Sequence, residues 1–238
     1  MELDIWEKWY DEILNDFNFS KEDDEKSAKI LSNVLETHGC LNLEELLSNC
    51  LNQNKFIVFG AGPSLEKHIK LIKSSYNLED YILISADGAT SALLKENLVP
   101  NIIVTDLDGK LDDLLESNKK GSLMVIHAHG NNSHEIKNLV TDFKNILGTT
   151  QSKPIKNLYN FGGFTDGDRA IFLSCKLKAE QIILAGMDFG NIITKYSRPN
   201  ISKDIEFADE IKEKKLKYAE ELTNWIKDNE NVEIINLN

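Results

Sequence analysis

The sequence of 238 residues contains few cysteines and prolines, and their scarcity excludes several classes of protein. The three cysteines, Cys40, Cys50 and Cys175, are odd in number and form no CxxC pair, so neither a disulfide framework nor a zinc ribbon is expected. The four prolines are scattered, and no Pro- or Ser-rich linker, low-complexity tract or fixed repeat divides the chain. We therefore expect one compact body in a reducing cytoplasm.

Long apolar runs and an excess of positive charge are also absent. No run approaches the length needed to cross a bilayer, and the first twenty residues lack the apolar stretch of a signal peptide. Lys and Arg number 27 against 39 Asp and Glu, a net charge of -12. This charge argues against nucleic-acid or membrane partners, because both need a basic face. We expect a soluble, cytoplasmic protein whose acidity is mostly solvated surface, with homodimer formation left open.

Residues 1–54 are predicted to form a helical N-terminal segment. An apolar stripe marks the first helix, a second helix follows Ser20 and stops at Gly39, and a third begins at Asn42, which has capping-box spacing to Glu45. The stripes consist of Ile5, Trp6, Trp9, Tyr10, Ile13, Leu14 and Phe17, then Ala28, Leu31, Val34 and Leu35, then Leu43, Leu46, Leu47 and Leu51. We interpret these helices as a lid or brace on the remaining chain.

Residues 55–238 alternate between strands and helices, which predicts a doubly wound α/β domain with a mostly parallel sheet. Strands such as FIVFG and IILAG are continuously apolar, as is typical of parallel strands that are buried on both faces. Helices are expected at 64–74, 90–97, 111–117, 133–147, 166–177 and about 203–228, before a last strand, VEIINL.

Six apolar runs end in Gly, Asp or His: FIVFGAGPS, YILISADGA, NIIVTDLDG, SLMVIHAHGNN, NLYNFGGFTDGD and QIILAGMDFG. In an open α/β sheet these endings should converge on one site, because ligands bind outside the carboxyl ends of the strands. They supply Asp87, Asp106, Asp108, Asp166, Asp168 and Asp188, but only one arginine, Arg169. This composition suits a metal-bound phosphate better than a bare phosphate.

The ADGAT and TDLDG motifs predict a magnesium site formed by Asp87, Asp106 and Asp108. Asp106 and Asp108 are two residues apart, so in an extended backbone their carboxylates point the same way and repel unless a cation lies between them. Magnesium prefers one or two carboxylates together with water and phosphate oxygens, and it would make this crevice a receptor for a nucleoside triphosphate. The alternative is that Asp87 and Asp106 are helix N-caps or Asx-turns.

The GAGPS motif has a ligand-binding and a purely structural interpretation. Gly60 and Gly62 would let a ligand approach the backbone, and Pro63 and Ser64 would open a helix whose free N–H groups face an anion. The same residues also suit a tight structural turn.

The remaining motifs contribute polar side chains. His127 and His129 lie on the same side of a strand end, and we favour contact with substrate or phosphate over a structural pair or a zinc site, because a third metal ligand is lacking. In GGFTDGDRA, Thr165 and Asp166 start a helix, with Asp166 as a simple cap the alternative, and Arg169 follows one turn later. Asp188 could orient a polar heterocycle.

Together the six motifs, behind a leader that begins W-x-x-W-Y, resemble the archaeal-type 6-hydroxymethyl-7,8-dihydropterin pyrophosphokinase family over nearly the whole chain. The ADG, D-x-D and TD elements are also similar to thiamin pyrophosphokinase. The resemblance implies transfer of diphosphate from ATP to the pterin hydroxymethyl group with release of AMP, a requirement for Mg²⁺, and a place in methanopterin or folate-type coenzyme biosynthesis. No nucleophilic Ser or Cys is needed, because diphosphoryl transfer depends mostly on positioning and electrostatics.

Carried over by position, the resemblance assigns metal and triphosphate handling to Asp106 and Asp108, supported by Asp87 and Asp166. The catalytic residues expected are Asp106, Asp108 and Asp166, and the binding residues are Gly60, Gly62, Pro63, Ser64, Asp87, Gly88, His127, His129, Gly130, Asn131, Thr165, Arg169 and Asp188. The chain departs from the family pattern at Asn131, where an acid is expected.

Two alternatives remain. The GAGPSL-type domain also resembles flagellin-modifying, glycosyltransferase-like proteins, in which a sugar nucleotide would occupy the crevice. The other is an inactive nucleotide-binding module, which would bind ATP without turnover. Release of AMP from ATP distinguishes the pyrophosphokinase from both.

Overall fold

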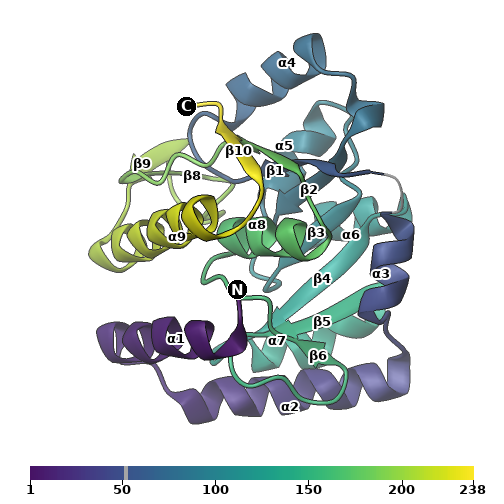
Figure 1. Ribbon diagram of the computed structural model, residues 1–238, viewed down its shortest axis with the longest axis vertical. Helices are drawn as coiled ribbons and strands as arrows, with labels where there is room; N and C mark the ends of the chain where they lie inside the picture. Colours follow the sequence, from purple (N-terminus) through teal and green to yellow (C-terminus); the bar gives the residue numbers. More distant parts are fainter. Residues whose placement is uncertain (51–52) are drawn as a thin grey trace.

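The computed structural model describes residues 1–50 and 53–238, and Leu51, which we assigned to the third apolar stripe, lies outside these residues. Eight strands form one sheet: β1 (Lys55–Phe59), β2 (Ile82–Ala86), β3 (Ile102–Thr105), β4 (Leu123–Ala128), β5 (Ile146–Thr150), β6 (Leu158–Tyr159), β7 (Gln181–Ala185) and β10 (Glu233–Asn236). Their order is β10-β7-β1-β2-β3-β4-β5-β6, and every neighbouring pair is parallel. The predicted parallel α/β architecture is confirmed (Figure 1).

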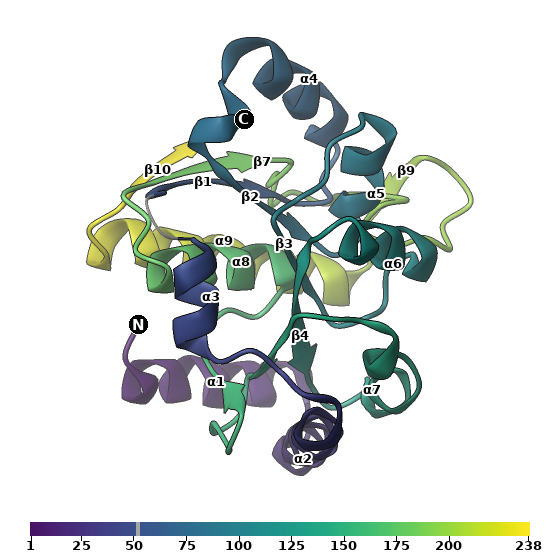
Figure 2. The same ribbon diagram turned by 90° about the vertical axis from the view of Figure 1, so that its right-hand side faces the viewer.

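The strand order reverses beside β1, and this reversal places helices on both faces. Right-handed crossovers that run one way along the sheet keep their helices on one face, and those that run the other way use the opposite face. Accordingly α4 (Leu65–Ser75), α5 (Ala89–Lys95), α6 (Leu111–Lys119) and α7 (Ser133–Leu139) lie opposite α8 (Asp166–Lys176) and α9 (Glu210–Asn229) (Figure 2). The switch between β1 and β7 is where such a fold binds its ligand.

Alternation along the strands gives each face its own core. Ile82 and Ile84 of β2 join a cluster with residues of α8 and α9, whereas Leu83 packs on the other face with residues of α4 and α5. Successive side chains of a strand point to opposite faces, so a fully apolar strand is the expected consequence of helices on both sides.

The predicted N-terminal helices are present as α1 (Leu3–Phe17), α2 (Lys21–His38) and α3 (Leu43–Asn49). Trp6 and Tyr10 of α1 and Leu46 of α3 are buried in the same cluster as α8 and α9, while Leu31 of α2 joins the core on the opposite face. The Asn42–Glu45 capping box forms as predicted, with N–H to side-chain oxygen distances of 2.7 and 2.9 Å.

Two predicted helices were wrong in extent. The helix expected at 133–147 ends at Leu139 and is followed by a 3₁₀ turn, η2 (Val140–Asp142), and then by β5. The prediction was wrong because periodicity alone cannot distinguish a short apolar strand such as Ile146–Thr150 from part of a helix. The helix expected from 203 starts at Glu210, where the Asp209 side chain caps it by accepting the Lys212 N–H at 2.7 Å. Before it, β9 (Ile205–Phe207) pairs antiparallel with β8 (Ile192–Thr194).

The remaining expected helices end within two residues of α4, α5, α6 and α8, and a second 3₁₀ turn, η1 (Leu78–Asp80), precedes β2. Across the described residues, no helix has both the length and the apolar character that a membrane crossing requires.

Candidate functional site

A cavity of about 460 Å³ opens at the carboxyl ends of the strands. All six predicted strand endings reach it, represented by Gly60, Asp87, Asp106, Gly130, Asp166 and Asp188. Gln151, which follows β5, also lines it. The predicted convergence is confirmed, and the volume lies in the range of small-molecule sites.

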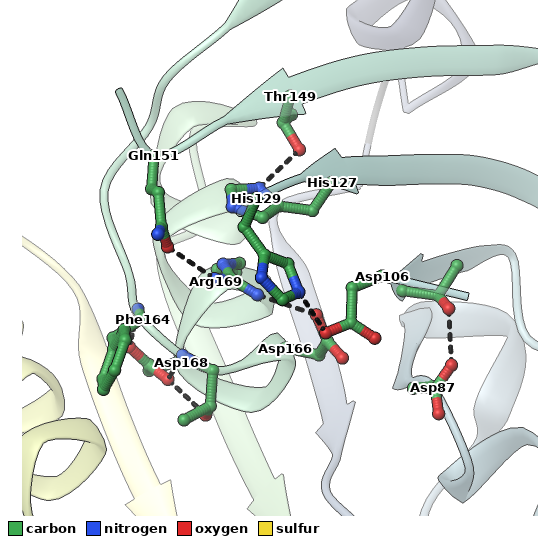
Figure 3. Close-up of polar contacts among 12 residues, drawn as sticks. Asp87, Asp106, His127, His129, Thr149, Gln151, Phe164, Asp166, Asp168 and Arg169 are labelled. Carbon is green, nitrogen blue, oxygen red and sulfur yellow. Dashed lines mark hydrogen bonds and ion pairs between the residues drawn. The ribbon is translucent and has the colours of Figure 1, made fainter. Parts of the chain in front are cut away.

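Three carboxylates form a cluster at this cavity. Asp87, Asp106 and Asp108 each present an oxygen within 4.8 Å of the other two, and in the described part of the chain they are the one such group of three Asp, Glu, His or Cys ligands. Asp87 accepts a hydrogen bond from Thr105 Oγ1 (Figure 3). Asp87 and Asp106 are not helix N-caps, because Gly88 and Lys110 are the N-cap residues of α5 and α6.

The backbone is shaped to bring Asp87 to this cluster. Asp87 adopts a positive φ of 38°, a conformation that Asp tolerates better than most residues. Gly109 leaves room beside it, because a Cβ there would displace the Asp87 carboxylate. Such features at a cavity mark a functional site more often than a packing site.

Burial and the neighbouring charges shift the pKa values of the three carboxyl groups. Burial, and then the charges of Asp108 and Asp166, raise the pKa of Asp87 well above its usual value. Burial and the charge of Asp106 raise the pKa of Asp108 to about 6. Burial would also raise the pKa of Asp106, but the hydrogen bond and charge of His129, with the charge of Arg169, outweigh burial and lower it.

The residues present fit a hard divalent cation. Asp106 Oδ1 is buried and has no hydrogen-bond partner in the described structure. The potential metal-ligand atoms of this cluster are all carboxylate oxygens. Oxygen ligands of this kind suit Mg²⁺ rather than a soft transition metal.

We expect Asp108→Asn to stabilise the metal-free protein at neutral pH. Because the pKa of Asp108 is about 6 in the folded chain and about 3.8 ordinarily, its contribution favours folding at low pH and is lost as the pH rises through 6. Thermal denaturation in chelator should give the variant the higher melting temperature at pH 7.5 and a smaller advantage at pH 5. Added Mg²⁺ should raise the wild-type melting temperature more than that of the variant. A metal-free wild type that is the more stable protein at pH 7.5 would contradict this.

The histidine loop positions one of its two histidines at the cluster. His129 Nε2 lies 2.8 Å from Asp106 Oδ2 (Figure 3). His127 is buried and does not line the cavity, and its Nδ1 forms a hydrogen bond of 3.0 Å with Thr149 Oγ1. Asn132, which the sequence analysis did not single out, donates from Nδ2 to the backbone oxygens of Asp106 and His127. His129, Gly130 and Asn131 line the cavity.

The start of α8 supplies an aspartate and an arginine. Thr165 is the N-cap and forms a capping box with Asp168, so the alternative of Asp166 as a simple cap is wrong. Asp166 instead pairs with Arg169 at 3.1 Å, and Arg169 Nη2 donates to Gln151 Oε1 at 3.1 Å (Figure 3). Burial, and then the charge of Asp106, raise the pKa of Asp166 well above its usual value.

The GAGPS turn is packed against the turn after β7. Ser64 donates from its backbone N–H and its hydroxyl to Asp188 Oδ2 at 3.2 and 2.9 Å, and a Cβ at Gly62 would collide with that carboxylate. The expected anion at the N-terminus of α4 is therefore Asp188 itself. Gly60 and Gly62 line the cavity together with Asp188 and Gly88, whereas Pro63 and Ser64 do not.

Three further parts of the cavity wall have no signal in the sequence. They are the α1–α2 turn around Phe19, the β8–β9 region with Ile193 and Tyr196, and two lysines of α9, Lys212 and Lys215. The α1–α2 turn and the two lysines lie far along the chain from most strand endings, so only folding brings them to the site, whereas the β8–β9 region begins a few residues after Asp188.

The fold and the site define a doubly wound α/β protein with an acidic cavity at its strand ends. A model of the family described as "6-hydroxymethylpterin diphosphokinase MptE-like" matches residues 28–194. The chain belongs to this family, as its motifs indicated.

Curated relatives match almost end to end, and each of three is named 6-hydroxymethyl-7,8-dihydropterin pyrophosphokinase. The relative from Methanothermobacter thermautotrophicus is 49% identical over 98% of this chain and 99% of its own length. That from Methanocaldococcus jannaschii is 47% identical over 99% and 100%. That from Pyrococcus furiosus is 43% identical over 99% and 98%.

Proposed function

We infer that this protein transfers the diphosphate of ATP to the hydroxymethyl group of 6-hydroxymethyl-7,8-dihydropterin and releases AMP. The observation that carries the inference is the cluster of Asp87, Asp106 and Asp108 in the cavity of a chain that belongs to the 6-hydroxymethylpterin diphosphokinase family. The names of relatives at 43–49% identity over nearly the whole chain support the same activity. The glycosyltransferase-like alternative has no such support.

Asp87, Asp106 and Asp108 would hold Mg²⁺ in this reaction. When bound, Mg²⁺ would neutralise charge on the phosphate oxygens and help to align them. His129 holds Asp106 through its 2.8 Å contact, which fixes the direction of that carboxylate. Asp166 lies at the same cavity, and its raised pKa suits a carboxylate that accepts the proton released by the attacking hydroxyl group.

Asp188 is suited to orient the heterocycle of a substrate. Its Oδ2 is held by Ser64, and its side chain lines the cavity beside Gly62 and the apolar Ile193. A fixed carboxylate beside an apolar side chain can accept hydrogen bonds from the amino and ring N–H groups of a pterin.

The purified protein should convert ATP and the hydroxymethyl dihydropterin into AMP and pterin diphosphate in equal amounts. Attack at the β-phosphorus leaves the α-phosphate on the nucleoside, so label placed on the γ-phosphorus should appear in the pterin product. Chromatography of the nucleotides and of the label measures both. ADP as the sole nucleotide product would make the protein an ordinary kinase, and ATP binding without turnover would make it an inactive module.

A further inference from the structure

Helix α9 presents two lysines to the acidic cavity. Lys212 and Lys215 are three positions apart, which places them on one face of the helix, and both line the cavity. Leu216 and Ala219 continue the same wall. The strand endings that line this cavity carry several carboxylates and one arginine, so these lysines add most of its positive charge.

The other lysines in this part of α9 differ because they have acidic partners. Lys214 Nζ lies 2.9 Å from Asp16 Oδ2, and Lys217 Nζ lies 3.8 Å from Glu221 Oε1. Within residues 1–50 and 53–238, the ammonium groups of Lys212 and Lys215 make no ion pair and no hydrogen bond. Their charges are therefore available to a ligand.

Lys215 is positioned by aromatic rings. Its Nζ lies 5.7 Å from the ring centroids of both Phe19 and Phe164, and Phe19 stacks on Phe17 at 5.3 Å. Aromatic faces orient an ammonium group without neutralising it. The α1–α2 turn, which carries Phe19, thereby sets the direction of a cation that α9 supplies.

The surroundings of Lys215 favour an anion. Burial lowers the pKa of Lys215, the charges of Lys212 and Arg169 lower it further, and Asp106 and Asp108 oppose them. A partly desolvated ammonium group beside two other cations gains stability when a polyanion enters.

Two other candidate phosphate receptors, the start of α4 and Arg169 in the cavity wall, are already engaged. The Ser64 N–H at the start of α4 donates to Asp188, and the two Nη atoms of Arg169 donate to Asp166 and Gln151. If a metal ion at the carboxylate cluster held part of a phosphate chain, the remaining phosphate oxygens would still lack a cationic partner. Lys212 and Lys215 are the side chains placed to meet them.

We propose that Lys215, assisted by Lys212, binds the phosphate chain of ATP, and that Lys215 stabilises the charge that develops on AMP as it leaves. The inference rests on the proposed function. The pterin hydroxyl oxygen bonds to the β-phosphorus while the bond from that phosphorus to the α–β bridging oxygen breaks. The electron pair stays on the departing oxygen of AMP, and the hydroxyl proton passes to a cavity carboxylate or to water. An ammonium group at the phosphate chain lowers the energy of that charge.

Lys215→Met tests this role, and Lys217→Met is the matched control, since it removes the same charge from an exposed position of the same helix. We expect Lys215→Met to lower kcat/KM for ATP by about a hundredfold, Lys215→Arg to recover most of that loss, and Lys217→Met to stay within about twofold of wild type. The affinity for the pterin in the absence of nucleotide, measured by fluorescence, should be the same in all three variants as in wild type. Equal ATP kinetics in Lys215→Met and Lys217→Met would overturn the proposal.

A binding measurement separates this proposal from the proposed function. Calorimetric titration with MgATP and with Mg²⁺ plus inorganic triphosphate, without pterin, should show at least about tenfold weaker binding by Lys215→Met than by Lys217→Met. If wild type binds MgATP but makes no AMP, the activity assignment fails while this difference in affinity still supports the lysine. Equal affinities in the two variants would overturn the lysine's role and leave the activity assignment standing. Melting temperatures of Lys215→Met and Lys215→Arg close to that of wild type would show that a loss of affinity does not come from misfolding.

Discussion

Asp106→Asn and Asp108→Asn should each lower the turnover of the pyrophosphokinase reaction by at least about a hundredfold while leaving the fold intact. Asp106 is the better placed of the two, because its Oδ2 is held by His129 at 2.8 Å and its buried Oδ1 has no partner in the described structure. Asn keeps the shape of the side chain but loses the charge that would position the metal. Steady-state formation of AMP at saturating Mg²⁺ is the measurement.

Asp112→Asn is the matched control for this loss of charge. Asp112 lies in the first turn of α6, a few residues beyond the cluster, but it is exposed and does not line the cavity. Its replacement should change turnover by less than about twofold, since exposed charges interact weakly with a site across solvent. If both cluster variants work at near-normal rates while Mg²⁺ is saturating, the carboxylates do not hold the metal.

Arg169→Met should destabilise the protein strongly. Arg169 is 8% exposed and pairs with Asp166, whose side chain is 14% exposed and shares the cavity with Asp106. Removing the arginine leaves a buried carboxylate among other carboxylates, and breaking a buried ion pair in this way costs about 3–5 kcal/mol. We expect the free energy of unfolding to fall by about 3 kcal/mol in urea denaturation of the metal-free protein.

Arg198→Met is the natural comparison, because Arg169 and Arg198 are the two arginines of the chain. Arg198 lies 2.7 Å from Asp209, closer than the Arg169 pair, yet its side chain is 42% exposed. Its loss should cost less than about 1 kcal/mol.

A second replacement tests the cause. Adding Asp166→Asn to Arg169→Met should recover at least about 1 kcal/mol, since it removes the unpaired carboxylate. Equal destabilisation by Arg169→Met and Arg198→Met would show that the buried pair has no special role.

The fold class and the place of the site could be predicted from the sequence. Continuous apolar strands that alternate with amphipathic helices specify a parallel sheet covered on both faces, and such a sheet brings its strand ends to one edge. Asp87, Asp106 and Asp108 could therefore be placed together although α5 and β3 lie between Asp87 and Asp106 in the chain. The ordered motifs around them were specific enough to indicate the family.

Local patterns were less reliable where two structures share one composition. Residues 146–147 fit the end of a helix as well as the start of β5, and the choice was made by pairing with β4. The GAGPS turn looked like an open anion receptor, but Asp188, more than a hundred residues later, fills it. His127 and His129 looked equivalent by spacing, yet burial separates them.

The distant cations that reach the cavity could be identified only from the packing of the folded chain. Lys215 belongs to a lysine-rich helix in which spacing alone does not distinguish it from Lys214 or Lys217. The contacts of α9 with α1, such as Tyr218 with Asp16 at 2.9 Å, help to set the rotation of the helix and turn one face towards the strand ends. Periodicity predicts that a helix has a buried face, whereas the orientation of that face depends on contacts between residues about two hundred positions apart, which no local pattern encodes.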